Sequence, residues 1–209
     1  MRQCQTKLWN IVMTSSISRI YQIAPEPVGA PSFEKFIAEL NETLDSGIKL
    51  VQLRAKNLNR REHLAVADLA LVACRKHGAP LIFNGSVEMA LEARCDGVHL
   101  TSEALMACQQ RPALAGFLVS AACHNEEQVA HAERIGADFI VVSPVFATKT
   151  HPEAVPIGWQ RFSDLAAGTK IPVFALGGMK PEMLEDAKKH GAWGIAAISS
   201  TWCSKASKE

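Results

Sequence analysis

The sequence has little net charge and no long apolar run. Among 209 residues, 22 lysines and arginines face 21 aspartates and glutamates, which leaves a formal charge of +1. Proteins that bind nucleic acid or membrane surfaces usually carry a basic excess, so this balance argues against both kinds of partner. No stretch approaches the roughly 18 apolar residues of a membrane span, and the run from Leu8 to Met13 is too short for a secretory signal. We therefore expect a cytoplasmic protein.

The sequence also lacks any close pairing of cysteines. Its six cysteines are scattered, with no pair at CxxC spacing, at Cys4, Cys74, Cys95, Cys108, Cys123 and Cys203. This spacing predicts reduced thiols, mostly buried, and gives no support to a zinc site. No arrangement of serine or cysteine with histidine indicates a nucleophilic triad. Four histidines fall on predicted helices and are expected at the surface, namely His63, His77, His131 and His190.

What the sequence does contain is a regular alternation of short apolar strands and amphipathic helices. Residues 1–16 show no period and are interpreted as a tail or a short cap at the bottom of a barrel, and residues 17–209 as one domain. Strands are predicted at 19–23, 48–53, 80–83, 97–100, 116–121, 138–143, 172–176 and 194–198. Helices are predicted at 33–44, 61–76, 86–93, 102–109, 125–135, 159–166 and 181–190. Ser32 is expected to cap the first helix, and Val72 to face inward from the second.

Eight such units predict a single compact α/β domain with a TIM (β/α)8 barrel. Strands that alternate with helices pair in parallel, because a parallel connection needs a crossover. Eight units close naturally into a barrel, whereas the alternative, a doubly wound open sheet, normally needs five or six strands. The chain is close to the shortest length for this barrel, which leaves little room for a second domain.

The reactive face of such a barrel lies at the carboxyl-terminal ends of its strands. After the second strand, Gln52, Arg54 and Lys56 alternate with two apolar residues and therefore share one side. An amide, a guanidinium and an ammonium group on one side would suit a phosphate or a diphosphate. The alternative interpretation is a solvated strand end with ordinary surface charges.

Glycines and serines follow the last two predicted strands. Gly177 and Gly178 would allow backbone N–H groups to approach a phosphate closely, and Ser199 and Ser200 could add donors there. The alternative interpretation of the glycine pair is a tight turn that requires positive φ angles. Both loops lie where TIM barrels commonly bind phosphate.

The stretch from Ser143 to Pro152 is rich in hydroxyl groups and flanked by prolines, which predicts a mobile lid over the barrel mouth. Thr148, Thr150 and His151 could then close on a phosphorylated ligand. A plain exposed loop is the alternative. His99 ends the fourth strand, so it faces either the mouth or the barrel core, and His124 follows the fifth strand.

Seven motifs in order carry a family resemblance. They are Gln52–Lys56, Phe83–Asn84, Asp96–Leu100, Gly136–Phe139, Pro144–Thr150, Ala175–Met179 and Ile195–Ser199. Over residues 19–202 they resemble the thiamine-phosphate synthase and thiazole tautomerase superfamily, whose fold is a compact TIM barrel. A more particular resemblance is to the synthase-like domain fused to some Nudix hydrolases, and it is carried by His151–Pro152, Gly158–Trp159 with Phe162, Ala175–Met179 and Trp202.

The resemblance implies a transferase of thiamine biosynthesis. Such a synthase joins hydroxymethylpyrimidine diphosphate to thiazole phosphate and releases diphosphate, with Mg²⁺ assisting. By the family's motifs, Gln52, Arg54 and Lys56 would hold the diphosphate and Asn84 would contact the pyrimidine. The residues that would line the site between the substrates are Ser120, Thr148 and Thr150, and those that would bind the thiazole phosphate are Gly177, Gly178, Ile198 and Ser199. The residues expected to take part in catalysis are Arg54, Lys56, Ser120 and His151.

The sequence departs from the family pattern at the expected metal ligands. One aspartate is replaced by Gly85 and the other by Ala104, and His151 stands in place of a lysine. Mg²⁺ usually binds through one or two carboxylates plus substrate phosphates, so we expect its site to be weakened and assign no metal ligand. Glu88 and Glu103 are nearby acids but no obvious replacements. Without the aspartates, the mouth is expected to be one-sidedly basic.

Three functions remain open at this point. The first is the synthase reaction, with activity in doubt because of the missing aspartates. The second is a thiazole-phosphate tautomerase-like enzyme that uses His99, His124 or His151 to move a proton, although the lid position of the catalytic histidine in that group is Pro144 here. The third is a non-catalytic module that binds thiamine phosphates and partners a separate Nudix hydrolase. A homo-oligomer is compatible with each.

Overall fold

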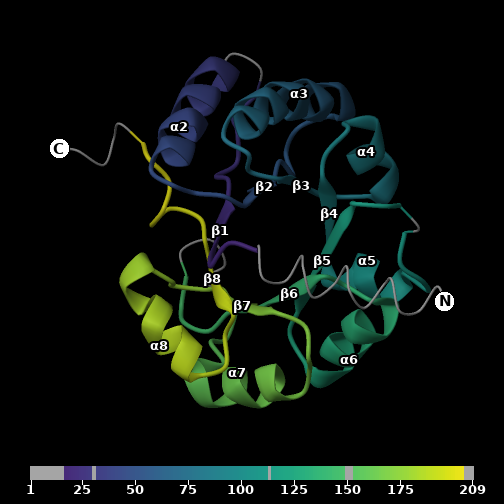
Figure 1. Cartoon of the computed structure of the whole chain (residues 1–209), viewed down its shortest axis with the longest axis vertical. Coiled ribbons are helices and arrows are strands. Elements are labelled where there is room, and N and C mark those ends of the chain that lie inside the picture. Colours follow the sequence, from purple (N-terminus) through teal and green to yellow (C-terminus); the bar gives the residue numbers. More distant parts are fainter. Residues whose placement is uncertain (1–16, 30–31, 113, 149–152, 205–209) are drawn as a thin grey trace.

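Eight parallel strands close on themselves into a barrel in this computed structural model of the protein (Figure 1). The structure describes residues 17–29, 32–112, 114–148 and 153–204, and all eight strands lie within them. They are β1 Ile20–Ile23, β2 Val51–Leu53, β3 Leu81–Asn84, β4 Gly97–Leu100, β5 Leu118–Cys123, β6 Phe139–Val142, β7 Val173–Ala175 and β8 Gly194–Ala197. Ile20 pairs with Ile195, which joins β1 to β8 and closes the ring. The predicted TIM barrel is confirmed, and the predicted tail or cap at residues 1–16 lies outside the described residues.

Helices surround the barrel on its outer side (Figure 1). They are α2 Phe33–Asp45, α3 Arg60–Lys76, α4 Val87–Glu92, α5 Ser102–Ala107, α6 Glu126–Ile135, α7 Gly158–Ala167 and α8 Leu184–Lys189, with a short 3-10 helix, η2 Pro181–Met183, before α8. Between α8 and α2 the outer layer is completed by the stretch after β8. There Trp202 stacks on Phe36 at 5.4 Å between ring centroids, and its indole N–H donates to Glu39 at 3.0 Å.

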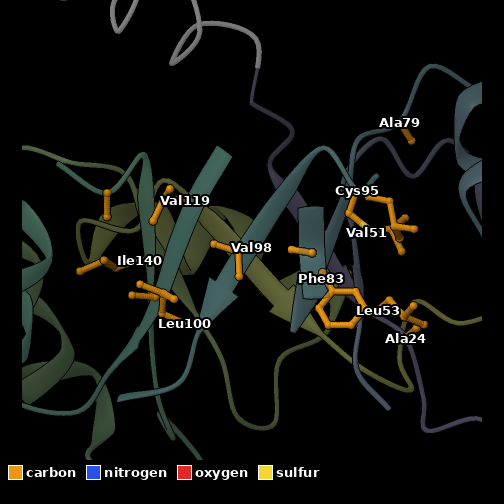
Figure 2. Close-up of a cluster of buried hydrophobic side chains, with 14 of the residues drawn as sticks. Ala24, Val51, Leu53, Ala79, Phe83, Cys95, Val98, Leu100, Val119 and Ile140 are labelled. Carbon is orange, nitrogen blue, oxygen red and sulfur yellow. The ribbon is translucent and has the colours of Figure 1, made fainter. Parts of the chain in front are cut away.

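Alternating side chains along each strand divide the interior into two apolar layers. Val51, Leu53 and Val98 belong to the layer between the strands and the helices (Figure 2). Tyr21, Phe139 and Phe174 fill the inside of the barrel, with Tyr21 edge-on to Phe139 at 5.2 Å between ring centroids. The barrel is therefore a packed core and not a pore, and a ligand site has to lie at one of its ends.

Local signals fix the beginnings of several helices. In α3 the Asn59 side chain accepts from the Glu62 backbone N–H at 3.0 Å, while the Glu62 carboxylate accepts from the Asn59 N–H at 3.2 Å. This reciprocal pair is a capping box. Ser32 precedes α2 but does not cap it, because its hydroxyl donates to the Gly29 carbonyl at 2.8 Å instead. The expected serine cap is thus wrong.

Several side chains lie where the sequence did not place them. Val72 is 72% exposed, because it lies on the outer side of α3 and not toward the barrel. His63 and His131 are buried and not at the surface: His63 stacks on Phe83 at 4.2 Å, and His131 bonds to the Cys108 carbonyl at 2.8 Å. A ring or a carbonyl beneath a helix is a tertiary feature that helical periodicity does not contain.

The cysteines confirm the prediction as far as the structure describes them. Cys74, Cys95 and Cys123 are buried free thiols, and Cys108 and Cys203 are free and partly buried. Burial raises the pKa of each of the three buried thiols to about 12, so they are neutral near pH 7. In the described part of the chain, no helix has both the length and the hydropathy needed to cross a bilayer.

Close approach of neighbouring strands makes Gly194 irreplaceable in the barrel. A Cβ at this position would lie 2.1 Å from the Arg19 carbonyl oxygen, which is backbone and cannot move aside cheaply. We expect Gly194→Ala to destabilise the protein by at least about 3 kcal/mol. Gly168→Ala is the matched control, because its Cβ would meet nothing closer than 3.4 Å, and it should cost less than about 1 kcal/mol. Urea unfolding of both variants checks this, and equal losses would contradict it.

Candidate functional site

A cavity of about 370 Å³ opens at the carboxyl-terminal end of the barrel. Every strand, or the residue that follows it, contributes to its wall. These contributions are Ile23, Gln52, Asn84, His99, Ala122, Ser143, Leu176 and Ile198 for β1 to β8 in turn. The cavity therefore occupies the position that barrel topology predicts for a reactive site, and its size suits a small molecule.

Most of the predicted binding residues meet at this cavity. Gln52, Arg54 and Lys56 all line it, which confirms that alternation puts them on one side. The other predicted residues that line it are Asn84, Thr148, Gly177 and Ile198. Gly178 and Ser199 are not among the lining residues, and Thr150 and His151 lie outside the part of the chain that the structure describes.

Ser120 lies one layer below the cavity and not on its wall. It is fully buried, and Ala122, the next inward-facing residue of β5, takes the position at the cavity. Ser200, the second predicted hydroxyl after β8, donates to the Met179 carbonyl at 2.8 Å. Its hydroxyl thus connects the loop after β8 to the loop after β7.

Arg54 has a partner that the sequence did not reveal. A carboxylate oxygen of Glu26, in the loop after β1, lies 3.3 Å from Arg54 Nη1, and the other oxygen accepts from the Asn57 N–H at 2.6 Å. Glu26 thereby connects this loop to the segment that carries Arg54 and Lys56. A single glutamate between two prolines has no periodic signal, so only its neighbours in the fold identify it.

The charge of the mouth is mixed, so the expected one-sidedly basic mouth is wrong. Glu26 pairs with Arg54 beside the cavity, and the carboxylate residue Glu153 is among the residues that line it. Lys56 is exposed at the rim. The site therefore presents both cationic and anionic groups to a ligand. Lys149, which follows Thr148 in the predicted lid, is outside the described residues.

The glycine pair after β7 allows two loops to pack closely. Gly177 and Gly178 have φ angles of +105° and +67°, and a Cβ on them would come within 2.9 Å of Pro144 and 3.0 Å of Phe146. The Val145 N–H donates to the Leu176 carbonyl at 2.8 Å, in the same contact between loops. The tight-turn interpretation is thus confirmed, while phosphate binding by these glycines remains a prediction.

The same contact fixes the first half of the predicted lid. Val145 is fully buried, the Phe146 N–H donates to the Gly177 carbonyl, and the Phe146 ring packs edge-on against Trp159 at 5.4 Å. The Pro144 carbonyl also accepts from the Ile157 N–H at 2.9 Å. Residues 144–146 are therefore packed against the loop after β7, and Pro144 among them lines the cavity. Residues 149–152, the other half of the predicted lid, are outside the described residues.

A buried polar network lies directly under the cavity. The Gln52 amide N–H donates to the Tyr21 hydroxyl at 2.9 Å, Tyr21 also hydrogen-bonds to Ser120, and Ser120 Oγ lies 2.9 Å from His99 Nδ1. Burial lowers the pKa of His99 to about 3 and raises the pKa of Tyr21, so both are neutral at physiological pH. The floor of the cavity is polar but uncharged.

His124 is the second histidine at the cavity. Its ring Nδ1–H donates to the Ser143 carbonyl at 2.8 Å, and its backbone N–H donates to Gln128 at 2.7 Å. Because a carbonyl oxygen can only accept, Nδ1 carries a proton in this contact. His99 in β4 and His124 directly after β5 thus both line the cavity, His99 from its floor.

The described side chains do not fit a protein-held Mg²⁺. Gly85 and Ala104 offer no oxygen ligand, and within the described residues no three histidine, cysteine or carboxylate side chains gather as a metal group. Glu88 and Glu103 are exposed on α4 and α5 and do not line the cavity. Glu26 is already engaged by Arg54 and by the Asn57 N–H. This donor set lacks the convergent carboxylates that Mg²⁺ prefers.

Comparison with known proteins agrees with this architecture. A family model described as thiamine monophosphate synthase, TMP-TENI, matches residues 20–201. The chain belongs to this family. It is 33% identical over 165 residues to a thiamine-phosphate synthase of Syntrophomonas wolfei, covering 78% of this chain and 79% of the relative. It is also 32% identical to that of Chloroflexus aurantiacus, with coverage of 78% and 76%.

A solved structure supports the fold of this TMP-TENI chain. A thiamine phosphate pyrophosphorylase from Pyrococcus furiosus superposes with a TM-score of 0.69 at 26% identity, covering 87% of this chain and 85% of that one. A 3-hexulose-6-phosphate synthase superposes with a TM-score of 0.59 at 16% identity and therefore shows the shared barrel alone. The particular resemblance to a domain fused to Nudix hydrolases remains a prediction.

The burial of neutral His99 makes stability depend on pH. Its pKa is about 3 in the folded protein against an ordinary 6.5, so below pH 6.5 the unfolded chain gains a proton that the folded protein does not. This contribution to stability is full above pH 6.5 and is lost as the pH falls toward 3, by up to about 1.4 kcal/mol per pH unit. In urea unfolding between pH 7 and pH 4, His99→Gln should show a correspondingly flatter profile than the wild type. Parallel profiles for the two proteins would refute this assignment, because the difference between the profiles cancels the contributions of all other titrating groups.

Proposed function

We propose that this chain is a transferase of thiamine biosynthesis that joins hydroxymethylpyrimidine diphosphate to thiazole phosphate and releases diphosphate. One observation carries the proposal: a single cavity brings Gln52 of β2 and the following residues Arg54 and Lys56 together with Gly177 and Ile198, which follow β7 and β8. A ligand with a phosphate group at each end would use both sets. The family and its named synthases agree with this substrate class.

The cations after β2 would act on the leaving group. In the transfer, the bond between the pyrimidine's methylene carbon and the diphosphate oxygen breaks, and the oxygen keeps the electron pair. The thiazole nitrogen supplies the pair for the new carbon–nitrogen bond. Negative charge grows on the departing diphosphate, where the planar fork of Arg54 and the point charge of Lys56 stabilise it.

The same two cations would also bind the diphosphate when the substrate enters the cavity. Arg54 Nη1 lies 3.3 Å from a Glu26 carboxylate oxygen, and both side chains are partly exposed, so this ion pair is only weakly stabilising. A diphosphate offers Arg54 several more anionic oxygens, while the Glu26 carboxylate keeps its bond to the Asn57 N–H. We therefore assign Glu26 the role of positioning the segment that carries both cations.

Transfer by this chain should be slower than in relatives that keep both aspartates. Gly85 and Ala104 supply no oxygen to a divalent cation, so Arg54 and Lys56 carry the diphosphate charge without that help. Mg²⁺ that arrives already bound to diphosphate is compatible with this arrangement. The proposal needs no metal held by the protein.

The transferase function is tested by a discontinuous assay for thiamine phosphate with both purified substrates. Arg54→Ala and Lys56→Ala should each lower kcat/KM by about 10-fold to 100-fold, the usual effect of removing a charged hydrogen-bond partner. Lys49→Ala is the matched control, because Lys49 precedes β2 at the opposite end of the barrel and donates to the His77 carbonyl. Its kcat/KM should stay within twofold of the wild type. No product above background from the wild type would reject the function.

Restoring the carboxylates tests the interpretation of the metal positions. Gly85→Asp combined with Ala104→Asp should create Mg²⁺ binding measurable by calorimetry, whereas the unmodified protein should show none without diphosphate. A Cβ at Gly85 would lie 2.8 Å from the Phe83 ring, so the ring has to shift slightly to admit it. Equal Mg²⁺ binding by the two proteins would show that other donors hold the ion.

Non-catalytic binding is the second candidate function, and the missing carboxylates favour it. A module that senses thiamine phosphates, alone or beside a separate Nudix hydrolase, needs the cavity but not the transfer step. Tight binding of thiamine phosphate in calorimetry without turnover would support it. For a tautomerase, His99 is a poor proton carrier because its pKa is about 3, which leaves His124 among the described histidines at the cavity.

A further inference from the structure

Gln22 of β1 is a fully buried amide in the apolar layer between the strands and the helices. Ile20 and Ala24, two residues before and after it, pack in that layer. Tyr21 and Ile23 alternate with them and point into the barrel. A buried amide without partners costs free energy, and a leucine of similar size would pack here without that cost. What Gln22 adds to the layer is therefore its hydrogen bonds.

Those hydrogen bonds connect the end of β1 to the segment that follows β8. The amide nitrogen of Gln22 donates to the Ile198 carbonyl at 2.8 Å and to the Ile23 carbonyl at 2.8 Å. The amide oxygen of Gln22 accepts from the Thr201 hydroxyl at 2.5 Å. Carbonyl oxygens can only accept, so the amide has to turn its nitrogen toward Ile198 and its oxygen toward Thr201. The partners of the amide thus determine its orientation.

The bond to the Ile198 carbonyl also determines where the next backbone N–H points. The Ile198–Ser199 peptide is trans, and in a trans peptide the C=O and the N–H point in opposite directions. Because the carbonyl is held toward β1, the Ser199 N–H points away from β1, toward β7, the other neighbour of β8 in the ring. Ser199 is exposed, and its N–H has no hydrogen-bond partner in the part of the chain that the structure describes.

On its other side the same segment is connected to the loop after β7. The Ser200 hydroxyl donates to the Met179 carbonyl at 2.8 Å, and Gly177 in that loop lines the cavity together with Ile198. Ser199 therefore lies between two residues that are each held by a hydrogen bond, Ile198 and Ser200. A phosphate at this end of the cavity, as the function proposed above requires, would meet the Ser199 N–H.

On the basis of the thiazole-phosphate site in that function, we propose that Gln22 and Thr201 are positioning residues that keep the Ser199 N–H directed at the phosphate. Gln22 holds the Ile198 carbonyl, and Thr201 holds the amide of Gln22. Neither side chain lines the cavity, so both act through the backbone. Without the amide, the Ile198–Ser199 peptide can turn its carbonyl oxygen toward the phosphate, and an anion is repelled by that oxygen.

Affinity is tested by calorimetry with two probes, 4-methyl-5-(2-hydroxyethyl)thiazole phosphate and inorganic pyrophosphate. Gln22→Leu should weaken binding of thiazole phosphate by about tenfold, as expected for one misplaced hydrogen bond to an anion. Thr201→Val should weaken it by only about threefold, because Gln22 keeps its donation to Ile198. Binding of pyrophosphate should stay within twofold in both variants, since Arg54 and Lys56 hold it at another part of the cavity.

Thr43→Val is the matched control for general loosening of the segment after β8. The Thr43 hydroxyl is also fully buried, and it accepts from the Cys203 N–H at 2.9 Å in the same segment. Its removal leaves the bond between Gln22 and the Ile198 carbonyl in place. Binding of thiazole phosphate by Thr43→Val should therefore stay within twofold of the wild type.

The direction of the Ser199 N–H can be tested in the wild-type protein by proton–nitrogen NMR. On addition of thiazole phosphate, the Ser199 amide proton should move downfield, because a hydrogen bond to an anion deshields the proton. In Gln22→Leu saturated with the same ligand, this shift should be lost. A wild-type Ser199 amide that does not respond overturns the proposal, and this measurement also covers the case in which Gln22→Leu does not fold.

The outcomes separate this proposal from the transferase function. Unchanged binding of thiazole phosphate by folded Gln22→Leu, an equal loss for both probes, or an equal loss in Thr43→Val overturns the positioning role, even in a protein that forms thiamine phosphate. Selective loss of thiazole phosphate by Gln22→Leu in a protein that forms no thiamine phosphate supports the positioning role and rejects the transferase.

Discussion

The parallel pairing that closes β1 onto β8 is the constraint on which the other features depend. Once the ring is closed, every second side chain of each strand points to the same interior, and equivalent positions of different strands fall into common layers. The aromatic layer of Tyr21, Phe139 and Phe174 fills the centre. The next positions toward the carboxyl-terminal end bring Gln52 and His99 to the cavity floor. The site is thus a consequence of barrel packing.

Polarity changes in steps along the barrel axis. Apolar rings occupy the centre, neutral hydrogen-bonding groups come next, and charged groups stand at the rim, where water screens them. Buried His99 gives up its charge, whereas Arg54 keeps its charge and has Glu26 beside it. This order suits a ligand with an uncharged ring and an anionic tail, because each part meets groups of matching hydration.

The glycine pair after β7 serves two structural purposes. Gly177 and Gly178 adopt positive φ angles and also leave room for Pro144 and Phe146, so the loops after β6 and β7 lock together. This contact packs residues 144–146 against the loop after β7. A glycine pair therefore does not by itself indicate a phosphate site, since close packing of two backbones requires the same residues.

The sequence by itself determined the barrel, all eight strands and the alternation that places Gln52, Arg54 and Lys56 on one side, because these depend on local periodicity. The interpretation of Gly85 and Ala104 as replaced metal ligands, which also comes from the sequence, remains a prediction. Only the tertiary structure decided that Glu26 pairs with Arg54, that His63 is buried against Phe83, and that Ser120 lies below the cavity and supports His99. Each of these contacts joins residues that are far apart in the chain. Strand register and the closure of the barrel bring such residues within hydrogen-bonding distance, so no local sequence pattern predicts the contacts.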